Sequence, residues 1–410
     1  MEKIFIENFN LKDVSIERFA AYIDSNGTPL VLPTIFSMVV NREGRVLLSR
    51  VKKGEDGNIN ENLEFSDLSE NVIRQYESKL LEFFEYCDSM ASSDASLPNV
   101  HKHTHAPSEF INKYINEYLI EQEEKGMKSV EQAKVALQAY YNYLAKIGIT
   151  YIRNLYIRPK QRKKANKNTK RRRAYKYIAR QTRSTMLLKS KSLRDELILQ
   201  FGVICGLRTH ENTSLFLNDF TYGKKKQSGF LTMFADLECN PDEQSFKYLL
   251  TITKSRRNEG SPSRVIYIPR ELLEKCRQYY LLERPVSEDN CLFVNNDPNT
   301  KGQAISPSTG TRIFREIKNT ILEQIVNGKI SELPLHEDNS YQHLRHSFAT
   351  EKFYELCGDI PHHAITEGHS VVTEIARLMG HKINKKKHAQ EITMRYIRSV
   401  DEMLIVEGKK

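Results

Sequence analysis

Residues 341–350, YQHLRHSFAT, place an arginine between two histidines at the start of an apolar, helix-like run. His343 and His346 are three residues apart, so on a helix they would share a face, and a zinc site could begin with this spacing. Arg345 argues against a metal, because a permanent cation among the ligands repels a metal ion. A piece of buried core and a pocket for an anion remain as interpretations. The rest of the chain has to supply the partners that each of them needs.

Composition indicates a soluble protein with a polyanionic partner. The 410 residues are 39% hydrophobic and 28% charged, an ordinary balance for a chain of two or three domains. The 62 Lys and Arg against 52 Asp and Glu give a net charge of +10, which favours nucleic acid or an anionic membrane surface as partner. The longest apolar run, residues 30–40, contains Pro33 and is too short to span a bilayer, so we expect no membrane insertion.

The N-terminus and the cysteines indicate a reducing compartment. The first residues, MEKIFIENFN, lack the basic-then-apolar order of a signal peptide. The six cysteines are widely spread and include no CxxC pair, so neither a disulfide framework nor a Cys-rich zinc site is indicated. We therefore expect a cytoplasmic protein with reduced thiols.

Apolar periodicity predicts a small all-α domain over residues 66–157. Apolar residues recur at three- and four-residue steps in the segments 72–87, 110–119 and 130–144. Residues 1–65 contain short β-branched pieces around Gly and Pro without a clear period. We interpret residues 1–65 as a small separate extension.

Residues 158–174 are predicted to be a basic interdomain linker. The run RPKQRKKANKNTKRRR (158–173) holds ten Lys or Arg among sixteen residues, and apolar periodicity vanishes there. One interpretation is a solvated tether or a targeting signal. The other is a tract that lies along a phosphate backbone between two DNA-contacting domains and adds salt-sensitive affinity without sequence information. The candidate DNA-binding residues are Arg158, Lys160, Arg162, Lys163, Lys164, Lys167, Lys170, Arg171, Arg172 and Arg173.

Residues 175–410 are predicted to mix helices with a small antiparallel sheet. A helix is expected around residues 193–205, with a break at Gly206. The pieces FLTMFADLE (230–238), KYLLTITK (247–254) and RVIYIP (264–269) are predicted to be β-rich, and the last two flank a turn, which indicates a hairpin. From Ser306 onward helices return. The predicted fold class is therefore mainly α with a small antiparallel β-sheet (α+β).

Five short motifs follow one another in a recognisable order. They are GLRTHE (206–211), TITKSRR (251–257), HLRHSFAT (343–350), LMGH (378–381) and ITMRYIRS (392–399). In this order they resemble the tyrosine recombinase (phage integrase) family, over residues 69 to about 405. The resemblance implies an all-α core-binding domain followed by a mixed α/β catalytic domain at 175–410, which ends in a C-terminal packing segment. Residues 1–65 have only a vague likeness to the arm-binding extensions of some members.

Two arginines in these motifs suit a phosphodiester substrate. By resemblance, Arg208 matches the first catalytic arginine, Arg345 the second, and Glu211 the acidic position that supports the first. Guanidinium groups on the non-bridging oxygens stabilise the pentacoordinate transition state beyond the ground state, because that state carries more negative charge. Arginine suits this role better than lysine, since its planar fork donates bidentately and never loses its charge.

The other matches supply a nucleophile and proton donors. Tyr396 matches the family's nucleophile, whose attack on phosphorus gives a phosphotyrosyl link that conserves the bond energy, so we expect no cofactor. Lys254 matches the hairpin lysine and is the candidate general acid for the leaving 5′ oxygen. His381 in LMGH matches the family's late histidine. The arginines take the place of a metal ion, and the chain has no obvious carboxylate cluster for a two-metal site, so no metal is expected.

The first departure from the family pattern is at the second arginine. The family usually has a histidine three residues before it, where this chain has Gln342, and His343 stands one place too late. His346 is interpreted as packing against or supporting Arg345. Gln342 could still donate a hydrogen bond to a phosphate oxygen.

The second departure is the spacing before the nucleophile. From His381 to Tyr396 is fifteen residues, longer than is common in the family, with a basic insert around residues 385–390. His388 lies nearer the usual distance, but it lacks the apolar-Gly lead of LMGH. We therefore prefer His381.

Together these expectations describe a site-specific DNA recombinase or integrase. It would cleave and rejoin double-stranded DNA through a 3′-phosphotyrosyl intermediate, in a tetramer on DNA, for integration or excision of a mobile element. By the same resemblance it would be a nucleoid-associated protein of bacterial or phage type. Two alternatives stay open, a type IB topoisomerase-like enzyme that relaxes supercoils, and a DNA-binding protein on the recombinase fold that has lost catalysis. Gln342 is the reason to keep the second.

Overall fold

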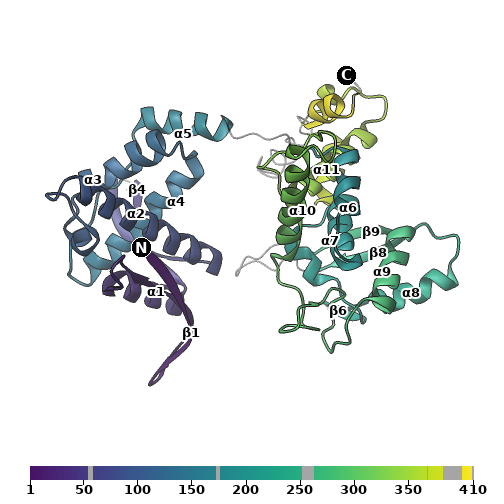
Figure 1. The fold of residues 1–410 in the computed structure, drawn as a ribbon, viewed down its shortest axis with the longest axis horizontal. Coiled ribbons are helices and arrows are strands. Elements are labelled where there is room, and N and C mark those ends of the chain that lie inside the picture. The colour runs from purple at the N-terminus through teal and green to yellow at the C-terminus, as the bar shows by residue number, and fades with distance from the viewer. Residues whose placement is uncertain (54–58, 172–175, 252–262, 367, 382–398, 409–410) are drawn as a thin grey trace. The chain divides into compact units, whose positions relative to one another are not determined.

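The computed structural model describes residues 1–53, 59–171, 176–251, 263–366, 368–381 and 399–408 (Figure 1). The chain divides into two compact units, Met1–Arg172 and Arg173–Lys410. Helices predominate in both units and every sheet is small and antiparallel, so the predicted α+β class is confirmed. Among the described residues, every helix is too short or too polar to cross a lipid bilayer.

The N-terminal unit begins with two antiparallel sheets and continues with helices. One sheet has the strand order β1-β2-β3, and the backbone N–H of Ala20 on β2 donates to the hydroxyl of Ser37 on α1 (2.9 Å). The second sheet is the β4–β5 hairpin. The elements are β1 (Glu2–Leu11), β2 (Val14–Ile23), β3 (Pro29–Leu30), α1 (Val31–Glu43), β4 (Arg45–Lys53), β5 (Ile59–Asp67), α2 (Glu70–Ser93), η1 (Val100–His105), α3 (Ser108–Lys113), the π-helical η2 (Tyr114–Gln122), α4 (Met127–Lys146) and α5 (Pro159–Arg171).

Residues 1–65, predicted as a separate extension, share one hydrophobic core with the helices that follow. The ring of Tyr22 on β2 lies 5.9 Å from that of Phe84 on α2, and Phe36 on α1 lies 5.3 Å from Tyr140 on α4. The expected separation is therefore corrected. β2 and α1 have different periods and span only 10 and 13 residues, so no clear repeat shows in the sequence.

Helix α5 occupies most of the residues predicted as a linker, and the boundary between the two units falls after it, at Arg172–Arg173. Gln161, Ala165 and Asn168 are buried at helical spacing, and the Asn168 side-chain amide donates to the carbonyl of Ile120 (3.1 Å). Only one of these three inward residues is apolar. The hydrophobic pattern that would have revealed the helix is therefore missing from the sequence.

The C-terminal unit surrounds one large hydrophobic core and a smaller one. Its elements are α6 (Arg180–Leu188), α7 (Leu193–Ile204), η3 (Thr209–Ser214), β6 (Phe220–Tyr222), β7 (Lys225–Gln227), α8 (Phe230–Cys239), β8 (Ser245–Leu250), β9 (Arg264–Pro269), α9 (Arg270–Leu282), α10 (Thr309–Val326), α11 (Tyr341–Cys357), η4 (His362–Ala364) and α12 (Ser370–Leu378). The predicted helix at 193–205 is α7, and the two strands of the predicted hairpin pair antiparallel as β8 and β9, while residues 252–262 between them lie outside the described residues.

The strand predicted at residues 230–238 is wrong, because this segment is helix α8. Phe230, Met233, Phe234 and Leu237 are buried at three- and four-residue steps, which is the helical period. The β-propensity of the two phenylalanines misled the prediction, and packing against the core decided the outcome.

The C-terminal residues 399–406 form a helix that packs on their own unit. Val400 and Met403 join the smaller core with Phe353 of α11 and Ile375 of α12. The carboxylate of Glu407 accepts hydrogen bonds from the Tyr177 hydroxyl (2.7 Å) and from the Arg180 backbone N–H (2.9 Å). The described part of the C-terminal packing segment thus packs on its own unit in this structure.

Candidate active site

The stretch YQHLRHSFAT forms the first turns of α11, and Tyr341 anchors it. The buried Tyr341 hydroxyl donates to the carbonyl of Ile198 on α7 (2.8 Å) and accepts from the side-chain amide of Asn212 (3.1 Å). A Cβ at Gly202 of α7 would lie 3.0 Å from the tyrosine ring. The absence of a side chain at Gly202 therefore lets the two helices approach closely enough to place Arg345 next to the end of α7.

The turn after α7 is shaped by Gly206. Gly206 has φ +61°, a left-handed conformation that favours glycine, and a Cβ there would collide with the ring of Phe348 on α11. The predicted helix break at Gly206 is confirmed, since α7 ends at Ile204. The turn brings the first motif, GLRTHE, against the third, HLRHSFAT.

Arg345 lies fully inside the protein. Its Nη1 donates to the carbonyl of Gly206 (2.5 Å) and lies 3.5 Å from the Glu211 carboxylate, and its Nη2 donates to the carbonyl of Met379. Its exposed fraction is 0%. In the observed arrangement Arg345 therefore joins three motifs and presents no surface to solvent.

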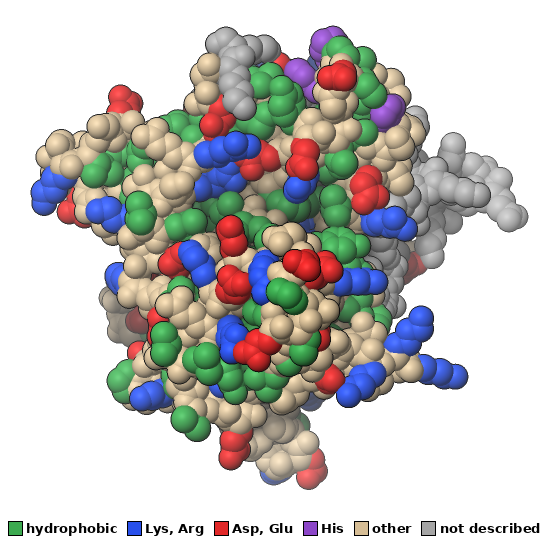
Figure 2. All heavy atoms as spheres, turned by 90° about the vertical axis from the view of Figure 1, so that its right-hand side faces the viewer, with side chains coloured by type: hydrophobic (Ala, Val, Ile, Leu, Met, Phe, Trp, Pro, Cys, Tyr) green, Lys and Arg blue, Asp and Glu red, His purple; other side chains and the backbone are tan. Residues whose placement is uncertain are grey.

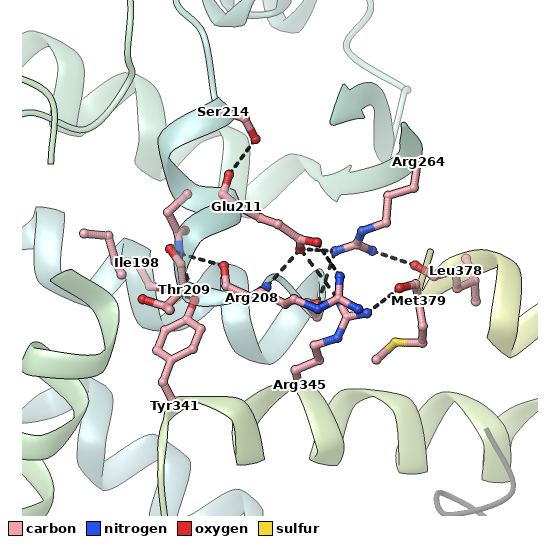
Figure 3. Close-up of polar contacts among 12 residues, drawn as sticks. Ile198, Arg208, Thr209, Glu211, Ser214, Arg264, Tyr341, Arg345, Leu378 and Met379 are labelled. Atoms are coloured by element: carbon pink, nitrogen blue, oxygen red, sulfur yellow. Dashed lines mark hydrogen bonds and ion pairs between the residues drawn. The ribbon is translucent and has the colours of Figure 1, made fainter. Parts of the chain in front are cut away.

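Glu211 is the centre of a cluster of three arginines (Figure 3). Its Oε1 lies 2.7 Å from Arg208 Nη1, and its Oε2 lies 2.8 Å from Arg264 Nη2 and 3.5 Å from Arg345 Nη1. The Arg208 backbone N–H also donates to Oε2 (2.9 Å). Burial alone would raise the pKa of Glu211, but Arg264, Arg345 and Arg208 outweigh it and hold the pKa at about 2. One carboxylate against three guanidiniums leaves these four side chains with a net charge of +2.

Arg264 is the member of the cluster that the sequence analysis missed. It is the first residue of β9, and it also donates to the carbonyls of Leu378 (2.6 Å) and Gly206 (3.2 Å). A signal was present in RVIYIP, because Arg264 shares the buried face of the strand with Ile266 and Ile268. A charge on the apolar face of a strand needs a partner, and this requirement points to a buried ion pair.

A cavity of about 610 Å³ adjoins the cluster. His381 reaches it at the end of the LMGH turn, where the His381 backbone N–H donates to the carbonyl of Ala376 (2.8 Å). The lining residues come from β8, β9 and α12 with their flanking turns, namely Lys247, Ser263, Arg264, Val265, Tyr267, Glu374, Arg377, Leu378, Gly380 and His381. The structure therefore brings Arg208, Glu211, Arg345 and His381 to one region. Lys254 and Tyr396 lie outside the described residues.

The polar residues around Arg345 differ in what they do. The Nδ1 atom of His343 accepts from the backbone N–H of Ser340 (2.9 Å), so His343 caps the N-terminus of α11. Burial, helped by the nearby Lys176, lowers the pKa of His343 to about 4, so the ring is neutral at pH 7. Gln342 is exposed, and His346 is half-buried, with its ring 5.8 Å from that of His343.

Within the described residues no group of three potential ligands could hold a metal ion.

Six of the ten basic residues predicted to bind DNA fall into two groups on α5 and at its start. The paired cations of α5, Arg158, Arg162 and Lys164, lie 3.3, 3.2 and 3.7 Å from carboxylates of the N-terminal unit. The outward lysines of α5, Lys160, Lys163 and Lys167, are exposed and share one face of the helix. The side chains of Lys170, Arg171, Arg172 and Arg173 lie outside the described part of the chain.

No protein-family model matches the chain, and no curated protein matches it. Solved structures do. The Tn1549 transposon integrase in complex with transposon right end DNA is 10% identical, with 90% of this chain and 94% of that chain covered and a TM-score of 0.48. A lambda integrase dimer bound to a COC′ core site is 12% identical, with 92% of each chain covered and a TM-score of 0.42.

These neighbours are tyrosine recombinases. They are of the family that the motifs resemble. The integrase from mycobacterium phage Brujita, which is 13% identical over 82% of this chain and 87% of that chain, has a TM-score of 0.28. Because all of these TM-scores lie below 0.5, the assignment of the site rests on the residues and contacts described above.

Proposed function

We propose that the protein is a site-specific DNA recombinase or integrase that joins Tyr396 transiently to a DNA strand. The observation that carries the proposal is the cluster around Glu211. Three segments far apart in the sequence bring Arg208, Arg264 and Arg345 to one carboxylate, and the cluster keeps a net charge of +2 beside the cavity that His381 lines. A phosphodiester is an anion that such a site would attract and polarise.

The proposed reaction conserves the number of phosphoester bonds. The Tyr396 hydroxyl attacks phosphorus and releases its proton to solvent, the bond from phosphorus to the 5′ oxygen breaks, and the 5′ oxygen takes a proton from Lys254. Attack by the 5′ hydroxyl of a partner strand on the phosphotyrosine then reverses these steps. Arg208, His381 and Arg345 would hold the non-bridging oxygens through both transfers.

The observed contacts impose one condition on this proposal. Arg208 keeps 20% of its side chain exposed, whereas Arg345 is closed off by the turn at residues 378–381. Arg208 would therefore meet the phosphate first. Arg345 would follow when its Nη2 exchanges the Met379 carbonyl for a phosphate oxygen, because a charged acceptor makes the stronger hydrogen bond.

DNA binding is proposed to use the outward lysines of α5. The paired cations of α5 are already neutralised by carboxylates, so they have less attraction left for phosphates. On the face of the C-terminal unit that Figure 2 shows, basic side chains are interspersed with acidic ones instead of forming one basic surface. We propose that strand exchange takes place in a tetramer on double-stranded DNA, for integration or excision of a mobile element.

A covalent trapping experiment tests the proposal. The purified chain is incubated with fragmented DNA in EDTA and denatured in detergent, and the DNA that stays joined to the protein is recovered and sequenced. We expect the wild-type protein to recover one recurrent junction and Tyr396→Phe to recover none. Absence of any adduct from the wild type would favour a DNA-binding protein without catalysis. Equal recovery by Tyr396→Phe would refute the assigned nucleophile.

A further inference from the structure

We propose that Arg264 is a positioning residue for the strand-transfer reaction. It would hold the LMGH turn (residues 378–381) against Glu211, so that His381 keeps its place when Arg345 turns to a phosphate. The inference rests on the proposed function, and it concerns a residue outside the five motifs of the sequence.

Arg264 connects three segments that are distant in the chain. Its Nη2 lies 2.8 Å from the Glu211 carboxylate and 3.2 Å from the Gly206 carbonyl, and its Nη1 donates to the Leu378 carbonyl (2.6 Å). Leu378 is the last residue of α12, where carbonyls lack helical partners and the helix dipole is negative. Arg264 therefore caps α12 three residues before His381.

Arg345 makes a parallel set of contacts to Gly206, Glu211 and Met379. Two arginines thus hold adjacent carbonyls at the end of α12 (Figure 3). If Arg345 gives up the Met379 carbonyl to bind a phosphate, the turn loses one of these two donors. Arg264 is the donor that remains, and it stays bound to Glu211, which Arg208 also contacts.

Gly380 shows that the turn is fitted closely around the Arg264 side chain. Gly380 has φ +59°, and a Cβ there would lie 2.7 Å from Arg264 Cδ. A side chain at position 380 would displace either the arginine or the turn that carries His381. The glycine of LMGH is therefore required by contact with Arg264 as well as by its left-handed backbone.

The test uses the full chain and the DNA junction recovered by covalent trapping. Single-turnover rates of adduct formation and non-covalent DNA affinities are measured for Arg264→Gln, Arg264→Lys, His381→Gln and the double variant Arg264→Gln/His381→Gln. We expect Arg264→Gln to slow adduct formation by about 100-fold, as a misplaced reacting group does, with little change in affinity. Arg264→Lys should recover part of the rate, because an ammonium group still pairs with Glu211.

The double variant separates positioning from general stability. If Arg264 acts through His381, adding Arg264→Gln to His381→Gln should slow the reaction by less than about 5-fold, because the group to be positioned is already gone. Arg284→Gln is the matched control. Arg284 also donates to backbone carbonyls, those of Leu292 (3.0 Å) and Cys291 (2.9 Å), but it has no contact with the cluster. It should lower the melting temperature and leave the rate unchanged.

The outcomes distinguish failure of the positioning role of Arg264 from failure of the proposed recombinase function. Wild-type rates in Arg264→Gln, or rate losses that multiply fully in the double variant, would overturn the positioning role while the recombinase function stands. Absence of an adduct with the wild type would overturn both. If Arg264→Gln does not fold, Arg264→Lys and Gly380→Ala carry the test, and unchanged rates in both would overturn the role of Arg264.

Discussion

Replacing Glu211 by glutamine should destabilise the C-terminal unit in a pH-dependent way. The three guanidiniums hold the pKa of Glu211 at about 2 against an ordinary value of 4.5. A difference of about 2.5 units corresponds to about 3 kcal/mol of stability at neutral pH. Breaking a buried ion pair by removing one partner costs about 3–5 kcal/mol, which agrees. For a unit of this size, 3 kcal/mol corresponds to a melting temperature lower by about 6–12 °C.

The pH dependence follows from the direction of the pKa shift. Because the folded pKa lies below the unfolded one, the contribution of Glu211 is complete above about pH 4.5 and is lost as the pH falls towards 2. About half of it should be gone by about pH 3.3. Glutamine does not titrate, so the difference in stability between the wild-type protein and Glu211→Gln should become smaller as the pH falls from about 4.5 towards 2.

Differential scanning calorimetry of the full chain between pH 7 and pH 3.5 measures this difference. Glu316→Gln is the matched control, since Glu316 pairs with Arg312 (3.1 Å) on the surface of α10 in the same unit. This control should change stability by less than about 0.5 kcal/mol. A melting difference for Glu211→Gln that stays constant from pH 7 to 3.5, or that is no larger than the control's, would refute the assignment of Glu211 as the shared counter-ion.

Two further predictions concern DNA binding and the anchoring of α11. Replacing the three outward lysines of α5 by glutamine should make the slope of log DNA affinity against log salt concentration shallower by about 2.7. Replacing the three paired cations of α5 should change this slope less. Binding titrations at several salt concentrations measure both slopes, and equal changes in the two variants would contradict the distinction between outward lysines and paired cations. Tyr341→Phe removes the hydroxyl that donates to the carbonyl of Ile198 and should cost about 0.5–1.5 kcal/mol in thermal unfolding, while Tyr354→Phe, at an exposed position of the same helix, should cost almost nothing.

The sequence predicted the elements with strong local patterns and missed those decided by distant partners. α2, α7 and the β8–β9 hairpin follow from apolar spacing and turn residues close by. α5 was missed because two of its three inward residues, Gln161 and Asn168, are polar and are buried by contact with other segments. α8 was misassigned because its phenylalanines suit a strand as well as a helix.

The candidate site likewise contains residues that local motifs identified and residues whose roles depend on distant partners. Arg208, Glu211 and Arg345 were identified from their motifs, and the structure places them in contact. Arg264 pairs with a carboxylate 53 residues away, and spacing within the sequence does not reveal a pair that only the fold brings together. His343 was ambiguous because a helix cap and a phosphate ligand look alike until the helix start is known.

The contact between Gly206 and Phe348 bears on how related chains are to be found. A side chain at 206 would occupy the space that the phenylalanine ring fills, so the two positions constrain each other across the two motifs that contain them. A side chain at position 206 would be tolerated only with a smaller residue at position 348. Distant homologues with another residue at position 206 should therefore also carry a smaller residue in place of Phe348, and a search that scores the two positions jointly would recover chains that either motif alone would miss.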